Sequence, residues 1–252
     1  MRSRRRAVGP LLALSALLAA WGAAALAFGP SVAPSPLRVA ARLGEFLVEG
    51  ARGRSALYHL WRSLLRVAVV SALALVLSTA LGLATGIDDR AEAAVGVWLP
   101  VWMTVPTLVV VLVAMVLLEF GEAAVVVGVT FVATPFATAN VREGARAVDP
   151  DLLEMARAFG VDRRGVVGDV YLPATLPHVL GSLRYLLGMV WKVVVLAETF
   201  GMNEGLGAMF RFWFTQGDVT AILAYLSLFV AVMVAVQGAI GVAADRLFPW
   251  QA

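Results

Sequence analysis

Apolar stretches separated by short polar segments run through nearly the whole chain. A helix needs about 20 mainly apolar residues to cross the roughly 30 Å hydrocarbon core of a bilayer. The stretches that reach or approach this length cover residues 8–28, 64–84, 105–118, 123–139, 176–200 and 219–242. The pattern therefore predicts an all-α, polytopic membrane protein with six transmembrane helices, folded as a single domain over residues 1–252.

The longest polar interruption, residues 141–172, contains a short segment with the marks of a helix. Asp149 suits the N-cap, Pro150 suits the first helical position, and Gly160 suits the left-handed residue that ends a helix. The apolar residues between them fall on one face: Leu152, Leu153, Ala156 and Phe159. Such an amphipathic helix either lies on a lipid surface or docks into a groove of another protein.

Arginine usage predicts which side of the membrane each loop occupies, because cytoplasmic loops are enriched in Arg and Lys. Arginines cluster before the first span and in residues 141–172, so both segments and both chain ends are expected in the cytoplasm. Four arginines on the predicted external side oppose this rule: Arg52, Arg54, Arg62 and Arg66. Residues 1–28 are expected to remain as the first span, although Ala25-Leu26-Ala27 also fits a signal-peptide cleavage site.

Composition narrows the function classes. The chain is 61% hydrophobic and 15% charged, which excludes a soluble globular domain and a nucleic-acid-binding one. It contains no cysteine, so it can form neither disulfides nor thiolate metal sites. His59 and His178 have no carboxylate at a ligand spacing, and no glycine loop with lysine is present to hold a nucleotide. We expect no metal site, no resident cofactor and no catalytic residue.

The fifth apolar stretch carries ionisable residues, which are costly inside a membrane and usually face a bundle interior or a watery cavity. Arg184, Trp191 and Glu198 recur every seven residues and share one helix stripe. Lys192, the single lysine, sits near mid-membrane. It either contacts an anionic solute or pairs with an acid. Pairing with Glu198 inside the helix is disfavoured, because six residues place the two side chains about 120° apart.

Pro135 lies inside the fourth apolar stretch, where it frees a backbone carbonyl and bends the helix. Two readings stay open. The kink either lines a solute pathway or is an ordinary tolerated bend.

The segment Glu154-x-Ala156, with Gly160 and Leu172-Pro173, resembles the cytoplasmic coupling loop of ABC-transporter permeases. The family usually has two alanines after the glutamate, and Met155 replaces the first of them here. Pro106, Pro135 and the turn Gly205-Leu206-Gly207 also match family positions. The resemblance covers nearly the whole chain from about residue 30, and it looks most like the nitrate/sulfonate/taurine branch of binding-protein-dependent importers.

This resemblance implies a MetI-like permease fold and a subunit that passes a small solute, anionic and sulfonate-, nitrate- or taurine-like, into the cytoplasm. The implied partners are a pair of ABC ATPase subunits that bind ATP and Mg²⁺, a second permease copy or a related chain, and an extracytoplasmic substrate-binding protein. The implied location is the bacterial plasma membrane. An ATPase-independent, channel-like protein is the alternative.

The resemblance also assigns residues to two sites. Those expected to couple to the ATPase are Asp149, Leu153, Glu154, Ala156, Arg157, Phe159, Gly160, Leu172 and Pro173. Those expected near the translocation pathway are Pro135, Arg184, Trp191 and Glu198, together with Lys192, which matches no usual family residue and is placed there by its charge near mid-membrane. The solute itself is not fixed by the sequence, because relatives of this branch also move pyrimidine and flavin precursors.

Overall fold

The computed structural model describes residues 2–247, with side chains placed from residue 12 to residue 242. Both chain ends, which the sequence places in the cytoplasm, include residues outside this description. Within it every regular element is helical, apart from one isolated bridge between Ala51 and Arg54. The predicted all-α fold is therefore confirmed for the described part of the chain.

The helices follow one another with short connections. In chain order they are α1 (Arg2–Phe28), α2 (Pro36–Val48), α3 (Ala56–Ile87), α4 (Asp89–Ala94), η1 (Gly96–Trp98), α5 (Leu99–Thr104), α6 (Thr107–Leu117), α7 (Glu122–Arg146), α8 (Pro150–Ala158), α9 (Arg163–Gly165), η2 (Val166–Tyr171), α10 (Leu172–Gly201), α11 (Leu206–Thr215) and α12 (Val219–Leu247).

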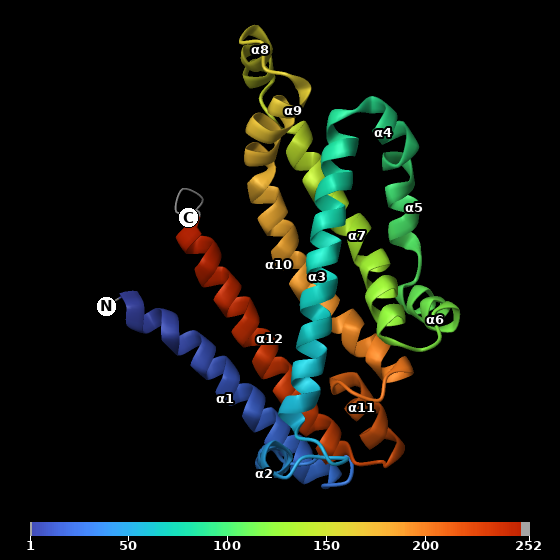
Figure 1. Ribbon diagram of the computed structural model, residues 1–252. Helices are drawn as coiled ribbons and strands as arrows, with labels where there is room; N and C mark the ends of the chain where they lie inside the picture. The colour runs from blue at the N-terminus through green and yellow to red at the C-terminus, as the bar shows by residue number, and fades with distance from the viewer. Residues whose placement is uncertain (1, 248–252) are drawn as a thin grey trace.

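The core is formed where α3, α7 and α10 pack against one another (Figure 1). Small residues permit this close contact. A Cβ added to Gly82 or Gly86 of α3 would come within 2.6 Å of the Cβ atoms of Val141 and Ala145 on α7, respectively. In contrast, α1 diverges from the bundle (Figure 1).

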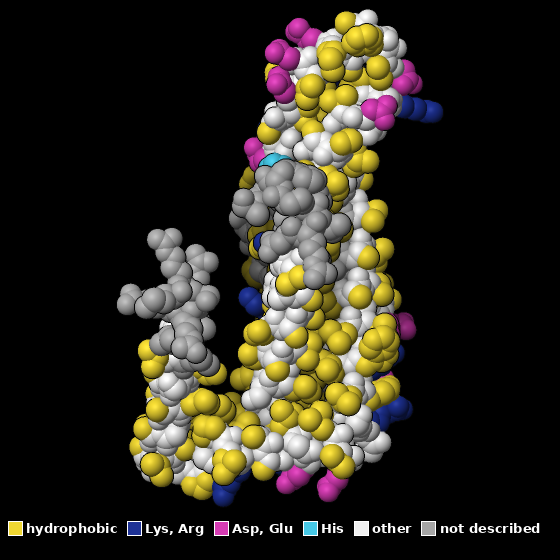
Figure 2. Space-filling model, turned by 90° about the vertical axis from the view of Figure 1, so that its left-hand side faces the viewer, with side chains coloured by type: hydrophobic (Ala, Val, Ile, Leu, Met, Phe, Trp, Pro, Cys, Tyr) yellow, Lys and Arg dark blue, Asp and Glu magenta, His cyan; other side chains and the backbone are white. Residues whose placement is uncertain are grey.

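The surface agrees with a membrane location. Most acidic side chains on the face seen in Figure 2 lie near the two ends of the elongated molecule, and the surface between them is largely apolar. A hydrocarbon environment selects for this distribution, because it solvates neither charges nor free backbone groups.

Four helical stretches are long and apolar enough to span a bilayer: Ala56–Ile87, Glu122–Arg146, Arg163–Gly201 and Val219–Val242. A fifth span is possible where Asp89–Thr104 and Thr107–Leu117 meet at a bend of 101°, and Leu12–Phe28 is a shorter apolar helix. The count of six transmembrane helices therefore stays a prediction.

The predicted third span over residues 105–118 takes a different form. The helix in this region, α6, has 11 residues, and at 1.5 Å per residue it extends only about 16 Å. The bend falls at Val105 and Pro106, both in extended conformations. Proline has no N–H to donate and disfavours helical geometry in the preceding residue, so it ends α5 and starts α6 in a new direction.

The predicted fifth span is longer than expected. Helical backbone runs without a break from Arg163 through the π-helical segment η2 into α10, a length of 39 residues. Leu172 and Pro173 therefore lie within this helix, at the first turn of α10.

The tight contact between α3 and α7 makes a testable prediction. Replacing Gly82 with Ile forces atoms into a space already filled by Val141, so we expect a loss of about 2 kcal/mol in stability and a fall of about 5 °C in Tm. Gly238→Ile on α12 is the matched control, because no atom lies within 4 Å of an added Cβ there. Thermal unfolding of the purified protein in detergent measures both, and equal Tm values would contradict this packing.

Candidate functional site

The helix α8 has the two ends that the sequence predicts. The Asp149 carboxylate accepts the N–H of Asp151 at 2.9 Å, and Pro150 occupies the first turn. At the other end, the N–H groups of Gly160 and Val161 each donate to carbonyls in the last helical turn at 3.0 Å. Gly160 has φ +73°, which completes a Schellman motif and explains why glycine stands there. The capped helix is thus confirmed.

The apolar residues of α8 divide between two faces. Ala156 is buried and Leu153 is half-buried against the rest of the chain. Leu152, Met155 and Phe159 are 43%, 52% and 81% exposed, and their spacing of three and four residues places them on one outward stripe. The predicted single face is therefore split, and Met155, the departure from the family pattern, belongs to the exposed stripe.

The position of α8 makes this stripe accessible. Figure 1 shows α8 at one extremity of the molecule, beyond the C-terminal end of α7 and the N-terminal end of α10. Glu154 and Arg157 are also exposed there, and Leu172 and Pro173 are exposed at the start of α10. Seven of the nine residues expected to couple to an ATPase are thus on the surface of this end.

An ion pair ties the segment after α8 to the end of α3. Arg163 on α9 lies 2.8 Å from the carboxylate of Asp88, the residue between α3 and α4. The Arg163 guanidinium and the N–H groups of Arg90 and Ala91 hold the pKa of Asp88 below its usual value. The charged form of Asp88 is therefore favoured, and it also caps the N-terminus of α4.

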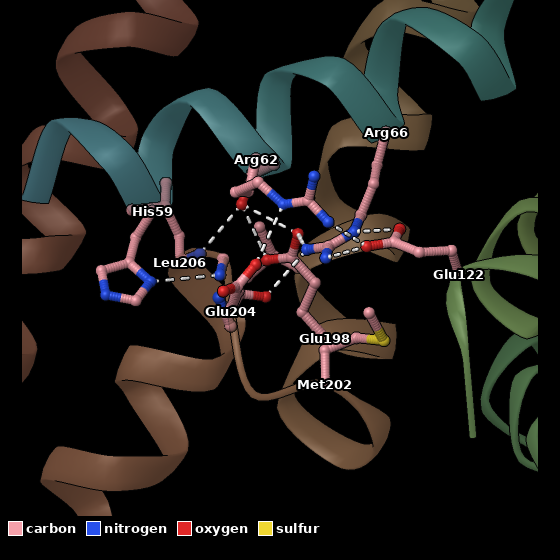
Figure 3. A network of polar contacts seen from close by, with 12 residues as sticks. His59, Arg62, Arg66, Glu122, Glu198, Met202, Glu204 and Leu206 are labelled. Atoms are coloured by element: carbon pink, nitrogen blue, oxygen red, sulfur yellow. Dashed lines mark hydrogen bonds and ion pairs between the residues drawn. The ribbon is translucent and has the colours of Figure 1, made fainter. Parts of the chain in front are cut away.

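At the opposite end of the molecule, Glu198 of α10 is fully buried and fully hydrogen-bonded (Figure 3). Its carboxylate lies 2.6 Å from Nη1 of Arg66, accepts the N–H of Gly207 at 3.0 Å, and is 2.8 Å from the hydroxyl of Ser63. Both Ser63 and Arg66 come from α3. A buried charge is stable only when it is paired and hydrogen-bonded in this way.

Arg66 extends the contacts to α7 (Figure 3). Its Nε and Nη2 bind the two carboxylate oxygens of Glu122 at 2.8 and 2.6 Å, and its Nη1 also donates to the carbonyl of Glu204 at 2.8 Å. Arg62, one turn earlier on α3, pairs with both Glu122 and Glu204. The cluster joins α3, α7, α10 and the turn before α11, and we call it the external ion cluster because the sequence predicts that Arg62 and Arg66 lie on the external side.

The turn at residues 203–207 packs closely against the cluster because two of its residues, Gly205 and Gly207, have no side chain. A Cβ on Gly205, which has φ +111°, would come within 2.3 Å of the Glu198 carboxylate carbon. A Cβ on Gly207 would come within 2.1 Å of the carbonyl oxygen of Val195. The N–H of Leu206 donates to Ser63 at 2.9 Å, so the first turn of α11 points its free N–H groups at the buried carboxylate.

The external ion cluster accounts for most of the arginines that oppose the positive-inside rule. Arg54, Arg62 and Arg66 all have carboxylate partners, while Arg52 lies over the ring of Phe212 at 5.1 Å. Paired arginines add little net charge to this side, and the rule concerns an excess of positive charge in loops.

The structure does not bring the five residues expected near the pathway into one place. Trp191 and Pro135 are buried in the core, and Glu198 is sealed in the external ion cluster. Arg184 and Lys192 are exposed on α10. Their role in a pathway is not decided by this arrangement, and it stays a proposal.

Sequence reasoning missed the partners of Glu198. Ser63 and Arg66 are separated from it by 135 and 132 residues, and no local pattern links positions so far apart. The available signal was chemical, because an arginine and a glutamate inside apolar stretches each need an opposite charge.

The external ion cluster makes a testable prediction. Glu198→Ala removes the carboxylate that accepts from Ser63, Gly207 and Nη1 of Arg66, and it leaves these buried donors unpaired while Arg66 keeps Glu122; we expect a loss of about 3 kcal/mol and a Tm lower by roughly 10 °C. Glu198→Gln keeps partners for Ser63 and Gly207 and should lie between that variant and the unmodified protein. Thermal unfolding in detergent measures the series, with the exposed Glu49→Ala as control. A Tm for Glu198→Ala equal to that of the control would contradict a stabilising cluster.

Comparison with curated proteins finds three informative relatives. The chain is 29% identical over 179 residues to a putative aliphatic sulfonates transport permease of Bacillus subtilis, covering 71% of this chain and 63% of that protein. It is 28% identical over 262 residues to a formylaminopyrimidine transport permease of Halalkalibacterium halodurans, covering 100% and 99%. It is 25% identical over 213 residues to a nitrate import permease of Synechocystis, covering 82% and 76%. The resemblance to the nitrate and sulfonate branch is confirmed.

Among solved structures, an inward-facing form of the MetNI methionine ABC transporter contains a similar chain. The TM-score is 0.67 at 20% sequence identity, and the match covers 83% of this chain and 98% of that one. This likeness confirms the MetI-like fold. Residues 78–249 match the family described as binding-protein-dependent transport system inner membrane component. The chain, which carries a capped helix exposed at one end of a helical bundle, belongs to that family.

Proposed function

We propose that this chain is the permease subunit of an ATP-driven ABC importer, which moves a small solute from an extracytoplasmic binding protein into the cytoplasm. The observation that carries the proposal is the exposed apolar stripe of α8, formed by Leu152, Met155 and Phe159 on a helix capped at both ends. An apolar stripe on a short rigid helix is the surface that helix-in-groove recognition uses.

The partner for α8 is the ATPase subunit, which binds ATP and Mg²⁺ and supplies the work. Phe159 and Met155 enter its groove, and Arg157 and Glu154 make polar contacts at the rim. Asp149 and Gly160 hold the helix ends, while Leu153 and Ala156 seat the helix on its own chain. Movement of α8 passes through α9 and η2 into α10, with Leu172 and Pro173 at the junction.

A second permease chain completes the membrane part, either an identical copy or a related subunit. Homo-oligomers with twofold symmetry are the commonest arrangement, and an identical copy would present a second α8 to a second ATPase. The α8 end then faces the cytoplasm of a bacterial plasma membrane, together with both chain termini, and the external ion cluster faces the binding protein. The five arginines in residues 141–172 support this orientation.

The solute is a small anion of the sulfonate, nitrate or taurine kind. Two of the three relatives carry such anions in their names, and the third names formylaminopyrimidine. Lys192, a cation exposed on the long helix α10, favours an anion over a neutral ring.

Docking through α8 makes a testable prediction. Phe159→Ala removes a large exposed apolar side chain whose burial against a partner is worth about 2 kcal/mol, so ATPase association should weaken roughly 30-fold. Phe214→Ala is the matched control, because Phe214 is 76% exposed on α11 at the other end of the molecule. Association is measured by co-purification and by titration of the purified ATPase subunit in detergent.

Either of two results would contradict the proposal. One is unchanged ATPase binding by the Phe159→Ala variant. The other is solute flux through vesicles that contain the permease without any ATPase, which is the behaviour of a channel-like protein.

A further inference from the structure

A narrow stripe of α10 is exposed between its contacts with α7 and α12. Gly181, Tyr185 and Lys192 are all exposed, and spacings of four and seven residues keep them within about 40° on the helix surface. On one side of the stripe, Gly188 approaches α12, where an added Cβ would lie 3.0 Å from Nε2 of Gln237. We call these three exposed residues the α10 stripe.

On the other side, the α10 stripe is bordered by α7. The amide of Asn140 donates to Ser182 Oγ and to the carbonyl of His178, each at 2.9 Å. A groove of 430 Å³ opens along this border. It is lined by Phe136, Ala137, Asn140, Gly181, Ser182 and Tyr185. Hydroxyl, amide and aromatic groups line the groove, and none of them is charged.

Lys192 has no hydrogen-bond or ion-pair partner among the described residues. The acids of the neighbouring cluster are already engaged: Glu198 by Arg66, Glu122 by Arg62 and Arg66, and Glu204 by Arg54 and Arg62. Of the two roles left open by the sequence, pairing with an acid of the same chain is therefore not found among the side chains that the structure describes.

The depth of Lys192 makes a lipid-facing position unfavourable. It lies nine residues before the end of α10 at Gly201, which corresponds to about 13 Å along the helix axis. Ionisable side chains at such depth almost always face a water-filled cavity or a bundle interior. The α10 stripe must then border water, with its opposite wall supplied by another chain.

We infer that the α10 stripe and the adjoining groove form one wall of the aqueous solute path, and that Lys192 selects a small, singly charged anion. Lys192 is the one cation of the stripe, since Arg184 lies about 80° away around the helix. One positive charge matches one negative charge, and the uncharged groove accommodates the remainder of the solute. This inference rests on the proposed permease function, and it assigns the path to particular residues, of which Tyr185, Asn140 and Ser182 were not expected from the sequence.

The chain contains no cysteine, so single cysteines can report water access without background labelling. Tyr185→Cys is placed in the permease–ATPase complex in lipid vesicles and treated with two water-soluble thiol reagents. One is the anion 2-sulfonatoethyl methanethiosulfonate, and the other is its trimethylammonium cation counterpart. Leu77→Cys on α3 is the matched control, because Leu77 and Tyr185 are both 47% exposed in the isolated chain while Leu77 borders a groove lined mainly by apolar side chains.

We expect both reagents to modify Cys at position 185 at least tenfold faster than at position 77. Adding Lys192→Met to the Tyr185→Cys variant should lower the ratio of anion to cation rates about fourfold. A unit charge about 10 Å away in water changes each rate roughly twofold, in opposite directions. Arg90→Met, which removes an exposed arginine near α8's end of the molecule, should leave the ratio unchanged.

Equal, slow labelling at positions 185 and 77 in an assembled complex would overturn the aqueous path, and an unchanged rate ratio after Lys192→Met would overturn the anion selectivity. Gly181→Cys gives a second reporter if the tyrosine variant does not assemble, because an added Cβ there meets only Asn140 Nδ2, at 3.6 Å. Failure of the ATPase to bind α8 while labelling stays fast would instead refute the proposed function and leave the aqueous stripe standing.

Discussion

The contact between Glu198 and Arg66 is the constraint on which the end of the molecule opposite α8 depends. Two opposite charges are removed from water there, and their attraction compensates for lost hydration only if every remaining donor and acceptor is also satisfied. Ser63, Gly207 and Glu122 meet that requirement. Each of them must therefore come from its own element to a fixed point, so one charge pair sets the mutual positions of α3, α7, α10 and α11.

The two ends of the bundle are built on opposite principles. At the Glu198 end, the polar side chains are paired with one another, and Gly205 and Gly207 let the backbone of their turn approach the Glu198 carboxylate closely. The other end leaves the apolar stripe of α8 open and holds its connecting segment through one surface ion pair, between Arg163 and Asp88. The long helices are therefore fixed by ion pairs at one end and carry an exposed apolar surface at the other. This arrangement suits the proposed function, in which a partner protein moves α8.

Local rules in the sequence predicted the helices well. The ends of α8 were predictable because Asp149, Pro150 and Gly160 act through backbone geometry within a few residues. The third span was predicted less well. Pro106 indicated a break in the helix, but hydrophobicity alone does not give the direction of the next helix. Here α6 leaves the break at an angle of 101° to the preceding helical stretch.

The pairing of Glu198 with Arg66 could not be predicted in the same way, since it depends on which helices become neighbours. Exposure of the α10 stripe likewise depends on where α7 and α12 happen to touch α10. Lys192 was conspicuous in the sequence, whereas Tyr185 and Asn140 are ordinary residues that gain importance only from their place beside it.

The unbroken helix from Arg163 to Gly201 has a mechanical consequence. Glu198 holds it near one end, and Arg163, 35 residues away at a distance of about 52 Å, joins the other end to α3 through Asp88. A tilt of about 5° at the Glu198 end displaces the Arg163 end by roughly 5 Å over that length, nearly the rise of one helical turn. A small change of angle at the buried charges therefore corresponds to a large displacement at the opposite surface, which the exposed Arg163–Asp88 pair must follow or release.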